Sequence, residues 1–164
     1  MISIVSMPFT NNTFIEKKAL QVMTYETANS HIIGFGGVFF KSKNPGHLLN
    51  WYKEHLGFST QTPYMEGDDA ITFKWHNWDG IPENTVWAPF PTDTTYFEPS
   101  EKEFMINYIV RDLKGLLEKL KAKGIMPIGN VATHSFGKFA QILDPEGTKI
   151  EFWEPDRDHF ADKY

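Results

Sequence analysis

The sequence predicts an α+β fold in which two tandem βαβββ modules form a curved mixed sheet with a concave cavity, the helices lying outside. Three observations predict it. The same order of strand and helix signals occurs twice, each helix has its own start and stop residues, and the chain closes on a hairpin with one apolar face. We expect an N-terminal extension over 1–31, modules over 32–98 and 99–155, and a C-terminal tail over 156–164.

Composition limits the classes of partner. The chain has 164 residues, 41% of them hydrophobic, which suits one domain or two small modules that share a core. A formal charge of −5 without Lys or Arg clusters argues against nucleic acid and against an anionic membrane. The absence of Cys excludes thiolate chemistry. With neither a signal peptide nor an apolar run long enough to span a bilayer, we expect a cytoplasmic protein.

The first module begins with a predicted strand near Ile33, followed by a helix with clear end signals. Asn44 suits the N-cap, Pro45 suits the first turn, and Gly57 suits the C-terminal end. The three strands expected after this helix cover residues 58–65, 70–76 and 84–90. This order is one βαβββ unit.

The second module repeats that order after a connector over 91–102 that is rich in Pro, Thr and Ser. An apolar strand is expected over 103–110, and Asp112 caps a helix that ends at Gly124 behind a run of lysines. Aligning the two halves places Asn44 on Asp112. An internal repeat of this kind sets the architecture.

The closing hairpin spans residues 137–155 around a turn over 144–147. Asp, Pro and Gly in that turn each favour its conformation. If these four residues form the whole loop, Gln141 faces Ile150 across the hairpin.

The two faces of the last strand carry different chemistry. The period of two places Ile150 and Phe152 on one face, which is apolar enough to pack against a helix. Lys149, Glu151 and Trp153 lie on the other face. A carboxylate beside an indole is a candidate site, although a carboxylate on a strand is more often simply solvated.

Two motifs carry a resemblance to a known superfamily. They are WYKEHLG over 51–57 and DPEGTKIEFWEP over 144–155. On tandem βαβββ modules these motifs resemble the vicinal oxygen chelate superfamily of glyoxalases, bleomycin-resistance proteins and extradiol dioxygenases. Residues 85–97 together with 104–113 are similar to a bacterial glyoxalase-like subgroup of largely unassigned activity.

That resemblance implies one divalent metal bound by residues of the first and last strand of each module. The four corresponding positions hold Gly37, Ala88, Met105 and Glu151. Zn²⁺, Fe²⁺ and Mn²⁺ bind imidazole or oxygen ligands, and only Glu151 offers one. We therefore expect no metal and no other cofactor.

A displaced metal site is the alternative. His76 and His134 are expected near the cavity, and together with Glu151 they would supply three ligands. This arrangement requires a metal centre at a position that the superfamily does not use.

The predicted registers place one polar cluster and several aromatic rings on the concave face. Glu151 is the candidate catalytic residue, as a general base. The candidate substrate-binding residues are Phe39, Trp75, Trp87, Met105, Asn107 and Trp153.

Three functions remain open at this point. The first is a metal-free protein that binds a small, partly apolar organic molecule in the sheet cavity. The second is a lyase, isomerase or dioxygenase type of enzyme, which uses Glu151 as a base or a displaced metal. The third is a scaffold whose cavity is filled by its own side chains. From the resemblance we also expect a homodimer.

Overall fold

The computed structural model describes residues 31–58, 70–77 and 80–160. All described elements belong to one compact unit, which begins at His31. The expected N-terminal extension and nearly all of the strand expected at 58–65 lie outside the described residues.

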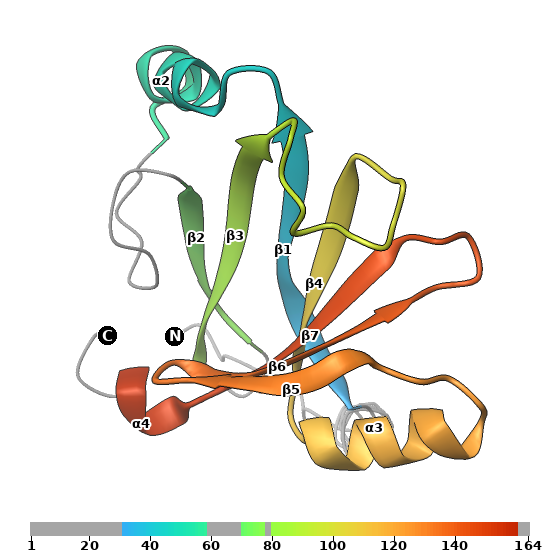
Figure 1. Cartoon of the computed structure of the whole chain (residues 1–164). Helices are drawn as coiled ribbons and strands as arrows, with labels where there is room; N and C mark the ends of the chain where they lie inside the picture. Colours follow the sequence, from blue (N-terminus) through green and yellow to red (C-terminus); the bar gives the residue numbers. More distant parts are fainter. Residues whose placement is uncertain (1–30, 59–69, 78–79, 161–164) are drawn as a thin grey trace, which may run out of the picture. The chain divides into compact units, whose positions relative to one another are not determined.

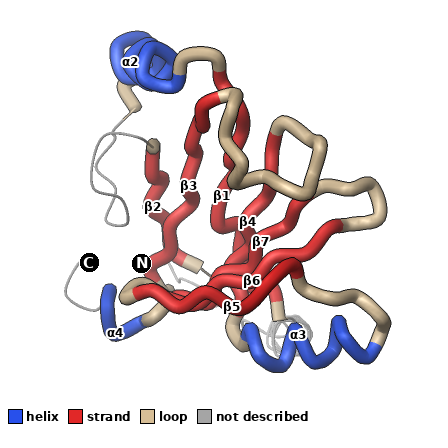
Figure 2. The backbone as a smooth tube through the Cα atoms, in the orientation of Figure 1, coloured by secondary structure: helices blue, strands red, loops and turns tan. Residues whose placement is uncertain are grey.

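Apart from a short helix within the expected C-terminal tail, the described elements follow the predicted order of strands and helices (Figures 1 and 2). They are β1 (Ile32–Ser42), α2 (Pro45–Leu56), β2 (Ile71–His76), β3 (Pro82–Pro91), β4 (Phe104–Val110), α3 (Leu113–Ala122), β5 (Ile128–His134), β6 (Gly137–Leu143), β7 (Lys149–Pro155) and α4 (Arg157–Phe160). None of these helices is long and apolar enough to cross a membrane.

The described strands form a seven-stranded mixed sheet in the order β2-β3-β1-β4-β7-β6-β5. Within the first module β1 pairs parallel with β3, and within the second β4 pairs parallel with β7. Antiparallel pairing of β1 with β4 joins the two modules. The predicted α+β fold with two repeated modules is confirmed.

Both predicted helix starts carry the expected capping contacts. The side chain of Asn44 accepts a hydrogen bond from the His47 backbone N at 3.0 Å, and that of Asp112 accepts one from the Gly115 backbone N at 2.9 Å. Helix α2 is followed by Gly57 as its C-terminal cap, with a positive φ of 68°. The two side-chain caps bind backbone N–H groups that have no partner within the helix, and glycine adopts the left-handed conformation at the C-terminal end without strain.

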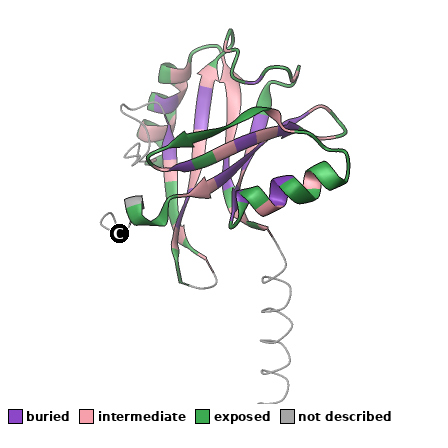
Figure 3. Ribbon diagram, turned by 60° about the horizontal axis from the view of Figure 1, so that its bottom comes forward, coloured by how far each residue is buried: buried purple, intermediate pink, exposed green. Residues whose placement is uncertain are grey.

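Helix α3 covers one face of the second module and forms the main core there. The buried members of this cluster are Val110, Leu113, Leu116, Leu117, Ala140, Ile142 and Phe152. Ile150 and Tyr108 pack against it. Figure 3 shows buried residues on the strands and on α3. The face of β7 that carries Ile150 and Phe152 therefore points towards the helix, as the period of two predicts.

The register of the closing hairpin differs by one residue from the expected one. Gln141 pairs with Glu151, and Ile142 is the residue that pairs with Ile150. The loop includes Thr148, because the Asp144 carboxylate accepts hydrogen bonds from the backbone N of Glu146 and of Thr148 at 2.9 and 2.8 Å. The fifth loop residue places Gln141 on the same face as Glu151.

Candidate functional site

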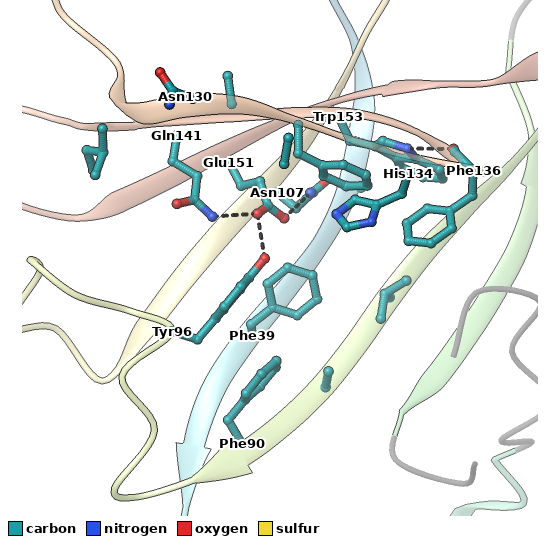
Figure 4. Close-up of a pocket in the computed structure, with 17 residues that line it drawn as sticks. Phe39, Phe90, Tyr96, Asn107, Asn130, His134, Phe136, Gln141, Glu151 and Trp153 are labelled. Carbon is teal, nitrogen blue, oxygen red and sulfur yellow. Dashed lines mark hydrogen bonds between the residues drawn. The ribbon is translucent and has the colours of Figure 1, made fainter. Parts of the chain in front are cut away.

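A cavity of about 420 Å³ lies on the sheet face that is opposite to the α3 core (Figure 4). Residues from β1 and from β3 to β7 line it, together with the connector that follows β3. Its aromatic lining consists of Phe39, Phe90, Tyr96, Phe136, Phe139 and Trp153. Its polar lining consists of Asn107, Asn130, His134, Gln141 and Glu151. A mostly apolar wall with a few polar groups is typical of a small-molecule site.

The Glu151 carboxylate is the centre of the polar lining and is only 2% exposed. Asn107 Nδ2 donates to its Oε1 at 2.8 Å. Gln141 Nε2 and Tyr96 Oη donate to its Oε2 at 2.7 and 2.6 Å. A buried carboxylate needs such donors, because they replace the water that it loses on folding. The three contacts also fix the orientation of the carboxylate.

Tyr96 reaches Glu151 from the connector between the modules. Its ring stacks on Phe90 at a centroid distance of 5.5 Å. Its backbone O accepts a hydrogen bond from Lys149 Nζ at 2.5 Å, and the same Nζ donates to Glu98 O at 2.9 Å. The connector is thus bound to β7 through both the backbone and the side chain of Tyr96.

Burial changes the acid–base behaviour of two of these groups. Burial raises the pKa of the Tyr96 phenol far above its usual value near 10, and the neighbouring Glu151 carboxylate raises it further. Burial lowers the pKa of the Lys149 ammonium, an effect that the charges of Glu151 and Glu98 partly oppose. The phenol therefore stays a donor to Glu151 throughout the neutral pH range.

Stacked rings form the wall beside Glu151. Phe139 and Trp153 are stacked at 6.0 Å, and the Trp153 indole N donates to the backbone O of Phe136 at 3.1 Å. His134 stacks on Phe136 at 5.3 Å. These contacts fix the rings relative to one another.

The structure brings together four of the seven residues that the sequence predicted for the site. Phe39, Asn107, Glu151 and Trp153 line the cavity, whereas Trp75, Trp87 and Met105 are not among its lining residues.

Each of these three residues has another position for a structural reason. Trp87 pairs with Val38 and packs against Tyr52 of α2 at 4.6 Å, on the helix side of the sheet. Trp75 donates to Thr85 Oγ1 at 3.0 Å and packs against a separate cluster of Ile109 and Trp153. Met105 lies on the same face of β4 as Asn107, but it is completely buried and has no surface in the cavity.

Two partners of Glu151 were missed by the sequence analysis. Tyr96 lies in a connector whose composition carries no periodic signal. Gln141 was assigned to the other face because the hairpin loop was expected to be one residue shorter. The signal that could have identified Gln141 was Thr148, a residue that is common in turns.

The four positions that correspond to the superfamily's metal ligands do not suit a metal. In each module the first-strand position pairs with a residue of the last strand: Gly37 with Val86, and Met105 with Lys149. Ala88 and Glu151 each lie two residues after that partner, so they occupy equivalent places in β3 and β7. Only Glu151 has an oxygen ligand there, and both its oxygens already accept hydrogen bonds. The residues present do not fit a divalent metal.

The displaced metal site is not formed either. No group of three or more His, Asp or Glu side chains within the described ranges could hold a metal ion, so His76, His134 and Glu151 do not converge.

Comparison with solved structures supports the fold. Methylmalonyl-CoA epimerase from Mycobacterium tuberculosis matches with a TM-score of 0.52 and 15% identity, covering 81% of this chain and 95% of that one. A methylmalonyl-CoA epimerase from Streptomyces coelicolor, in complex with 2-nitronate-propionyl-CoA, matches with a TM-score of 0.55 and 10% identity, covering 76% and 99%. A glyoxalase/bleomycin resistance protein/dioxygenase superfamily member from Vibrio splendidus 12B01 has a TM-score of 0.47 and 14% identity, covering 71% and 95%.

At these identities the likeness concerns the fold alone, and it agrees with the α+β fold expected from the sequence. No protein-family model matches the sequence, and no curated protein matches it.

Replacing Gly36 with Ala tests how closely Asn107 is packed in the site. A Cβ at Gly36 would lie 1.9 Å from Asn107 Oδ1, so the amide must move away from Glu151. We expect Gly36→Ala to lower the free energy of unfolding by about 1–3 kcal/mol in denaturant titrations. Gly46→Ala is the control, since a Cβ there meets no atom within 4 Å apart from its chain neighbours and the backbone of its own helix. Equal stability of Gly36→Ala and wild type would contradict the packing.

Tyrosine titration tests the burial of the Tyr96 phenol. The Tyr96 residue is 41% exposed, but its phenol oxygen is bonded to the buried Glu151 carboxylate. Because the pKa of this phenol is raised in the fold, Tyr96 should stay protonated at pH about 10, where a tyrosine with the usual pKa ionises. Native wild type and Tyr96→Phe should then gain equal tyrosinate absorbance up to pH about 11, whereas unfolded wild type should gain more than the unfolded variant. The unfolded phenol loses its proton first, so the stability that Tyr96 contributes is full below pH about 10 and declines above it. A larger native signal for wild type than for Tyr96→Phe would refute this.

Proposed function

We propose that the protein binds a small, partly apolar organic molecule in the sheet cavity, and that it does so without the divalent metal that the fold resemblance implies. One observation carries the proposal. A buried carboxylate, fixed by three neutral donors, lies in the wall of a mostly aromatic cavity.

The dimensions of the cavity suit such a ligand. Its volume of about 420 Å³ lies within the range of about 300–1,000 Å³ that is common for small-molecule sites. The stacked rings of Phe139 and Trp153 offer apolar surface, and Asn130 and His134 add polar groups at the β5 side. This combination encloses an apolar body while it orients one polar group of the ligand.

The fixed carboxylate favours binding over catalysis. Glu151 is held in one orientation by Tyr96, Asn107 and Gln141, which come from three separate elements. Preorganised polar groups lose little entropy when a ligand binds, so they contribute to affinity and specificity. To act as a general base, Glu151 would have to accept a proton from the substrate on one of its carboxylate oxygens, and both oxygens already accept hydrogen bonds from these donors.

A lyase, isomerase or dioxygenase type of enzyme remains the alternative function. It is supported by the place of Glu151 in the cavity, where the carboxylate would contact the substrate as a general base. Turnover of a ligand by wild type, together with its loss in Glu151→Gln without loss of binding, would identify the enzyme.

Thermal-shift measurements against a panel of small organic metabolites test the binding function. We expect at least one compound to raise the melting temperature in metal-free buffer, because a ligand that binds only the native state stabilises it. Glu151→Gln keeps the shape of the side chain and should reduce the shift. Glu154→Gln is the control: it lies on the same strand and pairs with Lys138 outside the cavity lining.

Metal dependence decides whether the site works as proposed. Elemental analysis after purification without affinity metals should find well below one Zn, Fe, Mn or Ni per chain. A stoichiometric metal, or ligand shifts that appear only when metal is added, would overturn the metal-free function.

We propose a homodimer on the basis of the fold resemblance. The outer strand β5 is largely exposed and includes Val131, a large apolar residue that is 45% exposed. Exposed strand edges of this kind are available for pairing with another copy. Light scattering at micromolar concentration should give twice the chain mass of 18.9 kDa, and the mass of one chain would contradict the dimer.

A further inference from the structure

We infer that the ligand of this cavity is a protonated amine carried on a small apolar or aromatic body, with its ammonium group against Glu151. The inference rests on the proposed function and names the ligand class of the same site.

The charge of the cavity favours a cation. Glu151 is the only carboxylate among the described residues that line it, and neither Lys nor Arg is part of that lining. Lys149 is close by, but its ammonium group donates to the backbone O atoms of Tyr96 and Glu98 and is not in the lining. An anionic ligand would therefore meet the Glu151 carboxylate with no Lys or Arg of the lining to compensate its charge, which is unfavourable in a buried site.

The Glu151 carboxylate can accept one more hydrogen bond than it does. A carboxylate can accept about four hydrogen bonds, and Glu151 accepts three, only one of them at Oε1. Asn107 Oδ1 is buried without a hydrogen-bond partner in the described structure, although the Nδ2 of the same amide donates to Glu151. That oxygen lies against Gly36 and has almost no accessible surface. The acceptor position left for a ligand is therefore the fourth one of the Glu151 carboxylate, and it requires a ligand that donates.

The aromatic rings distinguish an ammonium from a neutral hydroxyl. Figure 4 shows Phe39, Tyr96 and Trp153 around the Glu151 carboxylate. The face of an aromatic ring attracts a cation, and this attraction increases when the cation is removed from water. A hydroxyl could satisfy the remaining acceptor position of Glu151, but only a cation also balances the carboxylate charge and interacts with the rings.

Three probes with the same phenyl group test the inference on the wild-type protein by calorimetry in metal-free buffer. They are phenethylamine, phenethyl alcohol and phenylacetate, which differ in the charge and donor capacity of the polar end. Phenethylamine should bind at least about tenfold more tightly than phenethyl alcohol, with phenylacetate the weakest of the three.

The Glu151→Gln variant identifies the carboxylate as the source of that preference. In this variant the amine and the alcohol should bind within about threefold of each other, because the charge is lost while the ring contacts remain. Glu154→Gln should keep the wild-type preference. If Glu151→Gln does not fold, the order of affinities in the wild type decides the inference alone.

Several outcomes would overturn the inference. They are equal affinities of the wild type for amine and alcohol, tighter binding of phenylacetate, a retained preference in Glu151→Gln, and no binding of any probe. If one of these outcomes occurs but neutral compounds of the wider panel still raise the melting temperature, the inference fails and the proposed function stands. If no compound of any charge shifts the melting temperature, the proposed function itself fails.

Discussion

The buried carboxylate of Glu151 is the constraint on which the rest of the site depends. Its charge is tolerated at 2% exposure because Asn107, Gln141 and Tyr96 donate to it. These donors come from β4, from β6 and from the connector, so three elements must reach their final places before the charge is satisfied. Breaking any one contact leaves a buried charge with fewer donors, which links the geometry of the cavity to the stability of the second module.

The repeated backbone carries different chemistry in its two halves. Asn107 pairs with Glu151 across β4 and β7, and the equivalent pair across β1 and β3 is Phe39 with Ala88. All four residues line the cavity. One module therefore supplies a polar, hydrogen-bonded pair, and the other supplies an apolar pair at the matching place. The second module also contributes the rings of Phe136, Phe139 and Trp153, so the polar pair is set in a mostly apolar wall, which suits a ligand with two unlike ends.

The sequence predicted those features that depend on local signals. The caps at Asn44 and Asp112, and the alternation that separates Phe152 from Glu151, follow from residue type and period. Features that depend on loop length or on contacts distant in sequence were not predicted. Thr148 extends the hairpin loop by one residue and so turns Gln141 towards Glu151. Tyr96 lies 55 residues before its partner Glu151, and no pattern in its neighbourhood indicates the contact.

The connector is part of the site because β7 binds it at several points. Lys149 and Glu151 lie on the same face of β7, and one binds the backbone of the connector while the other binds the Tyr96 side chain. Ser100 Oγ donates to the backbone O of Gly147 at 2.5 Å, and Phe97 is 1% exposed. A buried ring and four hydrogen bonds fix a segment that would otherwise be a solvated linker. The ring of Tyr96 is consequently fixed in the cavity wall by contacts of the fold itself, so the connector contributes directly to the shape of the cavity.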